Sequence, residues 1–209
     1  MKAQSAKLAS VVLSSARDGL TSDGWRKRSG EIYTIDLAPE VIGWLGLNRA
    51  VGRGGSWMTV NPVIGVRHQT LERTLADLLE EKFHPYNPPT IRVNLGYLMP
   101  GQTVAQWGFG PGEDNASRVR DLVESVRRHG LPFLQATTSL RSILDKLLDP
   151  TSSFGINIQT AFRVPVAYLL LGDHASARSY LDKQVRLLGQ SQVDEEEYRR
   201  FAENLSRRL

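Results

Sequence analysis

Alternating apolar positions in the first half of the chain predict strands. In residues 30–37 the side chains of Tyr33, Ile35 and Leu37 alternate with polar ones, which is the period of a half-buried strand. β-branched and aromatic residues fill similar stretches between turn signals. We therefore expect four further strands, at 40–50, 56–67, 90–98 and 103–109.

Apolar residues three or four positions apart predict helices before, between and after these strands. Leu71, Leu75 and Leu78 form such a stripe within 68–84. Near the end of the chain, Asp194 and Glu197 match a capping box that opens a helix. The expected helices are 3–17, 68–84, 114–130, 138–150, 165–173, 174–189 and 194–209.

This order of elements predicts an α+β fold. We expect an antiparallel sheet of about five strands packed by helices and followed by a helical C-terminal half. Residues 1–112 would form the sheet part, and residues 113–209 the helical part packed on it as one compact unit.

Two glycine-rich segments raise the question of phosphate binding. A P-loop needs a helix directly after the glycines and a Lys-Ser/Thr pair, whereas residues 47–60 are followed by a predicted strand and contain no lysine. Residues 108–114, "GFGPGED", lack the spacing of a dinucleotide loop. We therefore predict a hairpin for the first segment and a strand-to-helix turn for the second, although Arg49 and Arg53 could still hold an anion at the hairpin tip.

The composition narrows the possible classes of protein. The 209 residues include no cysteine, which excludes disulfides and thiolate metal sites and fits a reducing, cytoplasmic environment. The 26 basic and 22 acidic residues give a net charge of only +4. No stretch approaches the ~20 apolar residues of a membrane span, and serines interrupt the apolar run at the N-terminus, which favours a helix over a signal peptide.

Signatures of catalysis are absent from the sequence. The four histidines lack the spacing of a metal site, and neither H-E-x-x-H nor G-x-S-x-G occurs. We therefore expect no catalytic residue, no metal and no cofactor.

Tryptophan and arginine dominate binding hot spots, so they provide the candidate binding residues. Core packing is the alternative role for each tryptophan. The candidates are Trp25, Arg26, Arg28, Arg49, Arg53 and Trp57.

Residues 20–148 resemble an uncharacterised family of bacterial domains of unknown function. Gly24, Trp25, Arg26 and Lys27, after a helix and before an alternating strand, are similar to that family's strand entry, and residues 130–147 are similar to its leucine-rich helical end. The resemblance carries over no functional residue. It implies a small cytosolic binding partner, in some relatives an immunity protein that neutralises a toxin.

Three hypotheses follow. The first is a non-enzymatic protein-binding module, of which an immunity or antitoxin-like protein that binds a toxin or effector is the most concrete version. The second is a nucleic-acid-associated factor that uses a positive surface. The third is an enzyme that binds a phosphorylated ligand through the loops at Arg49–Arg53 or Gly108–Gly112.

Overall fold

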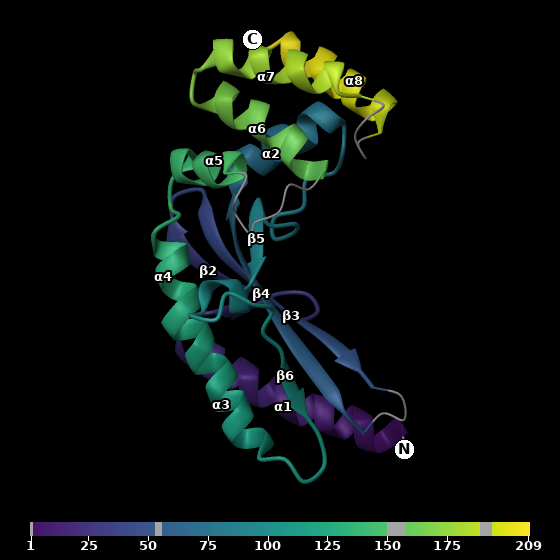
Figure 1. Cartoon of the computed structure of the whole chain (residues 1–209), viewed down its shortest axis with the longest axis vertical. Coiled ribbons are helices and arrows are strands. Elements are labelled where there is room, and N and C mark those ends of the chain that lie inside the picture. The colour runs from purple at the N-terminus through teal and green to yellow at the C-terminus, as the bar shows by residue number, and fades with distance from the viewer. Residues whose placement is uncertain (1, 53–55, 150–157, 189–193) are drawn as a thin grey trace. The chain divides into compact units, whose positions relative to one another are not determined.

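The computed structural model describes residues 2–52, 56–149, 158–188 and 194–209 (Figure 1). It has the α+β class expected from the sequence, with an antiparallel sheet in the order β1-β2-β3-β4-β5 and β6 paired to β4. The strands are β1 Arg26–Lys27, β2 Ile32–Ala38, β3 Val41–Val51, β4 Met58–His68, β5 Ile91–Asn94 and β6 Trp107–Phe109. The α-helices are α1 Lys2–Ser22, α2 Gln69–Leu79, α3 Asn115–Ser125, α4 Leu131–Gln135, α5 Leu140–Leu148, α6 Ile158–Leu170, α7 His174–Arg186 and α8 Glu195–Ser206.

The chain divides into two compact units that differ from the two contiguous parts expected from the sequence. Residues 1–37, 42–65 and 92–136 form what we call the sheet unit, and residues 38–41, 66–91 and 137–209 form the helical unit. Both units are therefore assembled from segments that are distant in the sequence.

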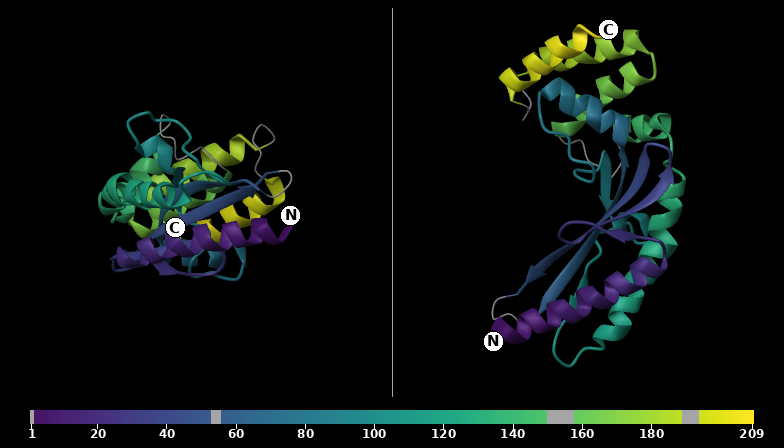
Figure 2. Two further views of the ribbon diagram at one scale, coloured as in Figure 1. Left: turned by 90° about the horizontal axis from the view of Figure 1, so that it is seen from below. Right: turned by 180° about the vertical axis from the view of Figure 1, so that it is seen from behind.

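The sheet unit packs strands against helices α1 and α3. These two helices contact each other (Figures 1 and 2). Its core contains the fully buried side chains of Leu20, Trp25, Tyr33, Leu45 and Phe109. Burial of such large apolar side chains is the main force that stabilises this unit.

Helices α2 and α5–α8 build the core of the helical unit. The rings of Phe162, Tyr198 and Phe201 lie 5.0–5.5 Å apart between centroids, in tilted and edge-on pairs. The Tyr198 hydroxyl donates a hydrogen bond to the Ala161 carbonyl at 3.2 Å, so its buried polar atom has a partner. Asp194 accepts from the backbone N–H of Glu197 at 2.8 Å, which confirms the expected start of α8.

Gly130 does not end a helix as we expected from its position. The chain passes from α3 through a π-helical segment, Val126–Gly130, directly into α4. A Cβ atom at Gly130 would lie 2.4 Å from Ile64 Cδ1. Glycine therefore serves close packing here rather than a turn.

The strand expected over 90–98 is also shorter in the structure. It ends at Asn94, whose side-chain oxygen accepts from the Gly96 N–H at 2.9 Å and begins a 3₁₀ turn at Leu95–Leu98.

Within the described residues, no helix has the length and apolar character needed to cross a membrane.

Candidate functional site

Several segments of the sheet unit contain candidate binding residues. Among those that the structure describes, the end of the β3–β4 hairpin has the most exposed large apolar side chains. The backbone N–H of Gly52 donates to the Trp57 carbonyl at 2.9 Å, and β3 and β4 are neighbours in the sheet. This confirms the hairpin predicted for residues 47–60. We call residues 48–52 and 56–60 the hairpin end.

Large apolar side chains at the hairpin end face solvent. Trp57 is 47 % exposed and Val51 50 % exposed, and all four residues 48–51 are exposed. Residues 42–65 contain Arg49 and Arg53 but no aspartate or glutamate. Among the residues that the structure describes, none forms an ion pair with Arg49. The hairpin end therefore combines an exposed indole with uncompensated positive charge.

Gly110, the residue after β6, packs against the ring of Trp57. A Cβ atom at Gly110 would lie 2.7 Å from the Trp57 ring, so only glycine allows the indole to lie directly on this backbone. β6 pairs with β4 in the register Met58↔Phe109, which brings residues 57 and 110 side by side. The indole is thus held on one side while its other side remains available.

The "GFGPGED" segment is the strand-to-helix turn that we predicted, between β6 and α3. The Asn115 side chain bonds both the N–H and the carbonyl of Gly110, at 3.1 and 3.0 Å. Asp114 caps α3 by accepting from the Ser117 N–H at 2.9 Å. These amides already have acceptors, and the Asp114 carboxylate occupies the place where a phosphate would have to bind.

Trp25 belongs to the core and not to the binding surface for which it was a candidate. Its side chain is only 1 % exposed. Trp44 and Trp107 are also buried, at 5 % and 8 % exposed, so core packing accounts for these three tryptophans. Trp57 differs from them because it lies at the hairpin end, where residues 48–52, 56 and 57 are exposed.

The basic residues after Trp25 are engaged with neighbours on β2 and in the turn before it. Arg26 forms an ion pair with Asp36, and Lys27 Nζ lies 3.5 Å from Glu31 Oε1. The Nε of Arg28 donates to Thr34 Oγ1 at 2.9 Å. Arg53 lies outside the described residues. Of the six candidates, Arg49 and Trp57 lie at the hairpin end, and both are exposed.

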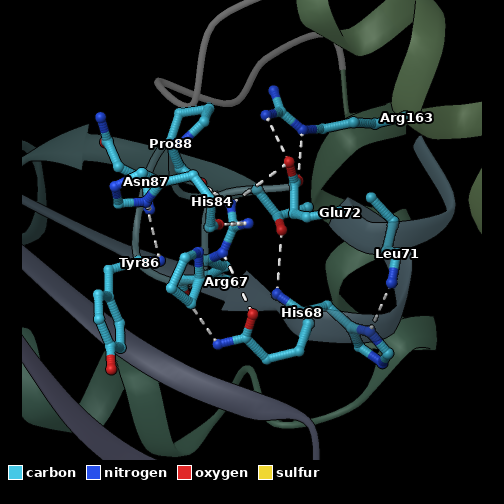
Figure 3. Close-up of polar contacts among 12 residues, drawn as sticks. Arg67, His68, Leu71, Glu72, His84, Tyr86, Asn87, Pro88 and Arg163 are labelled. Carbon is cyan, nitrogen blue, oxygen red and sulfur yellow. Dashed lines mark hydrogen bonds and ion pairs between the residues drawn. The ribbon is translucent and has the colours of Figure 1, made fainter. Parts of the chain in front are cut away.

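A second concentration of charge lies inside the helical unit, where Glu72 of α2 pairs with two arginines (Figure 3). Arg163 of α6 donates from Nε and Nη2 to the two Glu72 oxygens, at 2.7 and 3.1 Å. Arg67 at the end of β4 places Nη1 3.6 Å from Glu72 Oε2. All three side chains are at least 95 % buried, so we call them the buried arginine cluster.

Arg67 also fixes the loop that follows α2. Its guanidinium donates to the carbonyls of His84 and Pro88, and its Nε donates to Gln69 Oε1 at 3.3 Å (Figure 3). Its Cζ lies 5.3 Å from the centroid of the Phe83 ring. Burial lowers the pKa of Arg67 to about 10, against the opposing effect of Glu72, so the side chain keeps its charge at neutral pH.

The buried arginine cluster borders a pocket of about 160 Å³ but is arranged for structure. Both Glu72 oxygens take part in ion pairs, which join α2 to α6 and to the end of β4. Sequence analysis missed this cluster because Glu72 and Arg163 are 91 positions apart and no local pattern connects them.

His68 precedes α2 and caps it. Its Nδ1 accepts from the backbone N–H of Leu71 at 3.3 Å, which requires the neutral ring. Burial lowers the pKa of His68, and the charges of Glu40 and Glu72 oppose that shift. Its role in the structure is therefore that of a helix cap.

Comparisons with known proteins leave these sites without a template: no family model, no curated protein and no solved structure matches the chain. Within the described ranges, no group of three histidine, aspartate or glutamate side chains is placed to hold a metal ion.

Proposed function

We propose that this chain is a non-enzymatic protein-binding module that contacts its partner through the hairpin end. The observation that carries the proposal is the half-exposed Trp57, which lies on Gly110 and shares the hairpin end with Arg49. Exposed tryptophan and arginine side chains on a rigid support are the usual anchors of protein interfaces. A partner that covers Trp57 and Val51 would remove their apolar surface from water.

Nucleic acid is a less favoured partner. Arg26 and Lys27, the strongest basic cluster beside a tryptophan, already pair with Asp36 and Glu31. Trp25 is buried and cannot stack on a base. The remaining positive charge at the hairpin end suits an acidic protein surface.

The resemblance noted in the sequence adds a narrower proposal, that the partner is a toxin or effector which this chain neutralises. Neutralisation requires only tight binding over the partner's working surface, and no chemistry by the chain itself. Identification of the partner would decide this point.

Affinity purification with matched variants tests the proposal. The wild-type chain and the Trp57→Ala and Arg49→Glu variants would be used as bait in the native cell, with Arg199→Glu on α8 as a charge-matched control. A partner that co-purifies with wild type and control, and reconstitutes a complex from purified components, should be reduced about tenfold or more with Trp57→Ala. Equal recovery with all four baits would contradict the proposal.

A further inference from the structure

One edge of β3 is open along the hairpin end. β2 begins at Ile32, and the backbone N–H of Leu47 donates to the Glu31 carbonyl at 3.0 Å at that limit. β3 continues for residues 48–51 beyond this point. Among the residues that the structure describes, no strand pairs with this stretch on the side away from β4.

The register of the hairpin decides which backbone groups face the open edge. Gly52 bonds to Trp57 across the hairpin, so residues 50 and 48, at alternate positions, also direct their backbone groups toward β4. Leu47 directs its N–H the other way, toward Glu31. By the same alternation, Arg49 and Val51 direct their N–H and C=O groups toward the open edge.

Such an edge can accept a strand from another protein. Added strands bind through main-chain hydrogen bonds, and alternate side chains set the specificity. Here the side chains next to the edge include Arg49, and residues 42–65 carry no acidic residue. Pairing of two copies edge to edge would bring two such positively charged segments together, which disfavours a second copy of this chain as the occupant.

We propose that an extended, acidic segment of a partner protein adds as a strand to the open edge of β3, bonding the backbone of Arg49 and Val51. This inference rests on the proposed function and specifies how the partner binds. Arg49 and Val51 are two positions apart and share one face of β3, so the acidic side chains of the added strand lie on that face beside Arg49, and its apolar side chains lie on the opposite face.

Amide hydrogen exchange resolved by NMR tests the proposal residue by residue. The probe is a synthetic peptide of eight alternating valine and glutamate residues, and the matched control replaces glutamate by lysine. In the free protein the amides of Asn48 and Ala50 should be protected and those of Arg49 and Val51 should exchange rapidly. The acidic peptide should slow exchange at Arg49 and Val51, and the basic peptide should not.

Two variants separate the backbone contribution from the charge. Val51→Pro removes an N–H that faces the edge while leaving the bonds to β4 in place, and should weaken the acidic peptide about fivefold. The thermal unfolding midpoint of Val51→Pro is measured as a control for folding. Arg49→Glu leaves the backbone intact and should reverse the preference, so that the basic peptide binds more tightly than the acidic one.

Several results would overturn strand addition. These are binding of the acidic peptide without protection at Arg49 and Val51, equal binding of both peptides, or concentration-dependent protection in the absence of peptide, which would assign the edge to a second copy. Loss of the purified partner with Trp57→Ala but full binding by Val51→Pro would also refute it while leaving the proposed function intact. A partner indifferent to both variants would refute both proposals.

Discussion

Arginines in the two units serve opposite purposes. In the helical unit Arg67 and Arg163 are almost fully buried, and they bond a carboxylate and backbone carbonyls. In the sheet unit Arg49 is exposed, and no described residue forms an ion pair with it. A buried arginine with bonded donors fixes chain segments that are distant in sequence, whereas an exposed one keeps its donors for a partner.

The contrast extends to the residues beside the arginines. In the helical unit the Cζ atoms of Arg67 and Arg73 lie 5.3 and 5.0 Å from the ring centroid of Phe83, which is partly buried. Trp57 in the sheet unit has one side on Gly110 and the other exposed. The aromatic ring near the arginines of the helical unit is therefore part of an internal contact, whereas the indole of the hairpin end is half exposed.

The largest expected effect comes from breaking the buried arginine cluster. Glu72→Gln removes the negative charge while keeping the shape, and it leaves two guanidinium groups buried without their counter-ion. We expect a loss of about 3–5 kcal/mol in the free energy of unfolding, measured by urea denaturation. Glu113→Gln, at the exposed pair with Arg118, is the control and should cost less than about 1 kcal/mol. Similar costs for both variants would show that the cluster is not a structural core element.

A smaller effect is expected from the support under Trp57. Gly110→Ala forces the indole off the backbone and should cost about 1–2 kcal/mol, with a red shift of tryptophan fluorescence. The control is Gly108→Ala in β6, where nothing lies within 4 Å of the added methyl group. An unshifted spectrum in Gly110→Ala would mean that Trp57 is not held as described.

The pH dependence of stability tests His68 as a cap in the helical unit. Because the pKa of His68 is lower in the folded state, the unfolded state takes up a proton first as the pH falls. The stabilisation is complete above the ordinary value of about 6.5 and declines below it. His68→Asn keeps an acceptor that does not titrate, so its unfolding free energy should fall less steeply below pH 6.5 than that of the wild type. An unfolding free energy of His68→Asn that falls as steeply as that of the wild type would contradict the role of His68 as a titrating cap.

The smallest effect on stability is expected at the hairpin end, where substitutions should have the largest effect on partner binding. Arg49→Glu alters an exposed side chain, so it should change the free energy of unfolding by less than about 1 kcal/mol in urea denaturation. A larger loss in Arg49→Glu would mean that this arginine stabilises the fold, and the contrast with Arg67 would fail.

Local patterns were enough to predict much of the fold. The glycines between 47 and 60 predicted the hairpin because turn chemistry acts over a few residues, and the leucines of α2 predicted its buried face for the same reason. The prediction that a helix ends at Gly130 was wrong. Glycine is found both at helix ends and where a side chain, here Ile64, packs closely on the backbone, and the sequence does not distinguish the two.

The candidate sites were only partly accessible from the sequence. Composition pointed to Trp57 and Arg49, but the contact between Trp57 and Gly110 depends on the pairing of β4 with β6. Trp25 has the same residue type and basic neighbours, yet it is buried. The link from Glu72 to Arg163 requires the packing of α2 on α6, which no spacing in the sequence records.

The most direct test of the contrast between the two units is hydrogen exchange of the whole chain with and without its purified partner. We predict slower exchange at residues 48–51 and 56–60 of the hairpin end, and unchanged exchange in residues 66–91, which include Arg67 and Glu72. Protection confined to residues 66–91, with the hairpin end unaffected, would contradict the account.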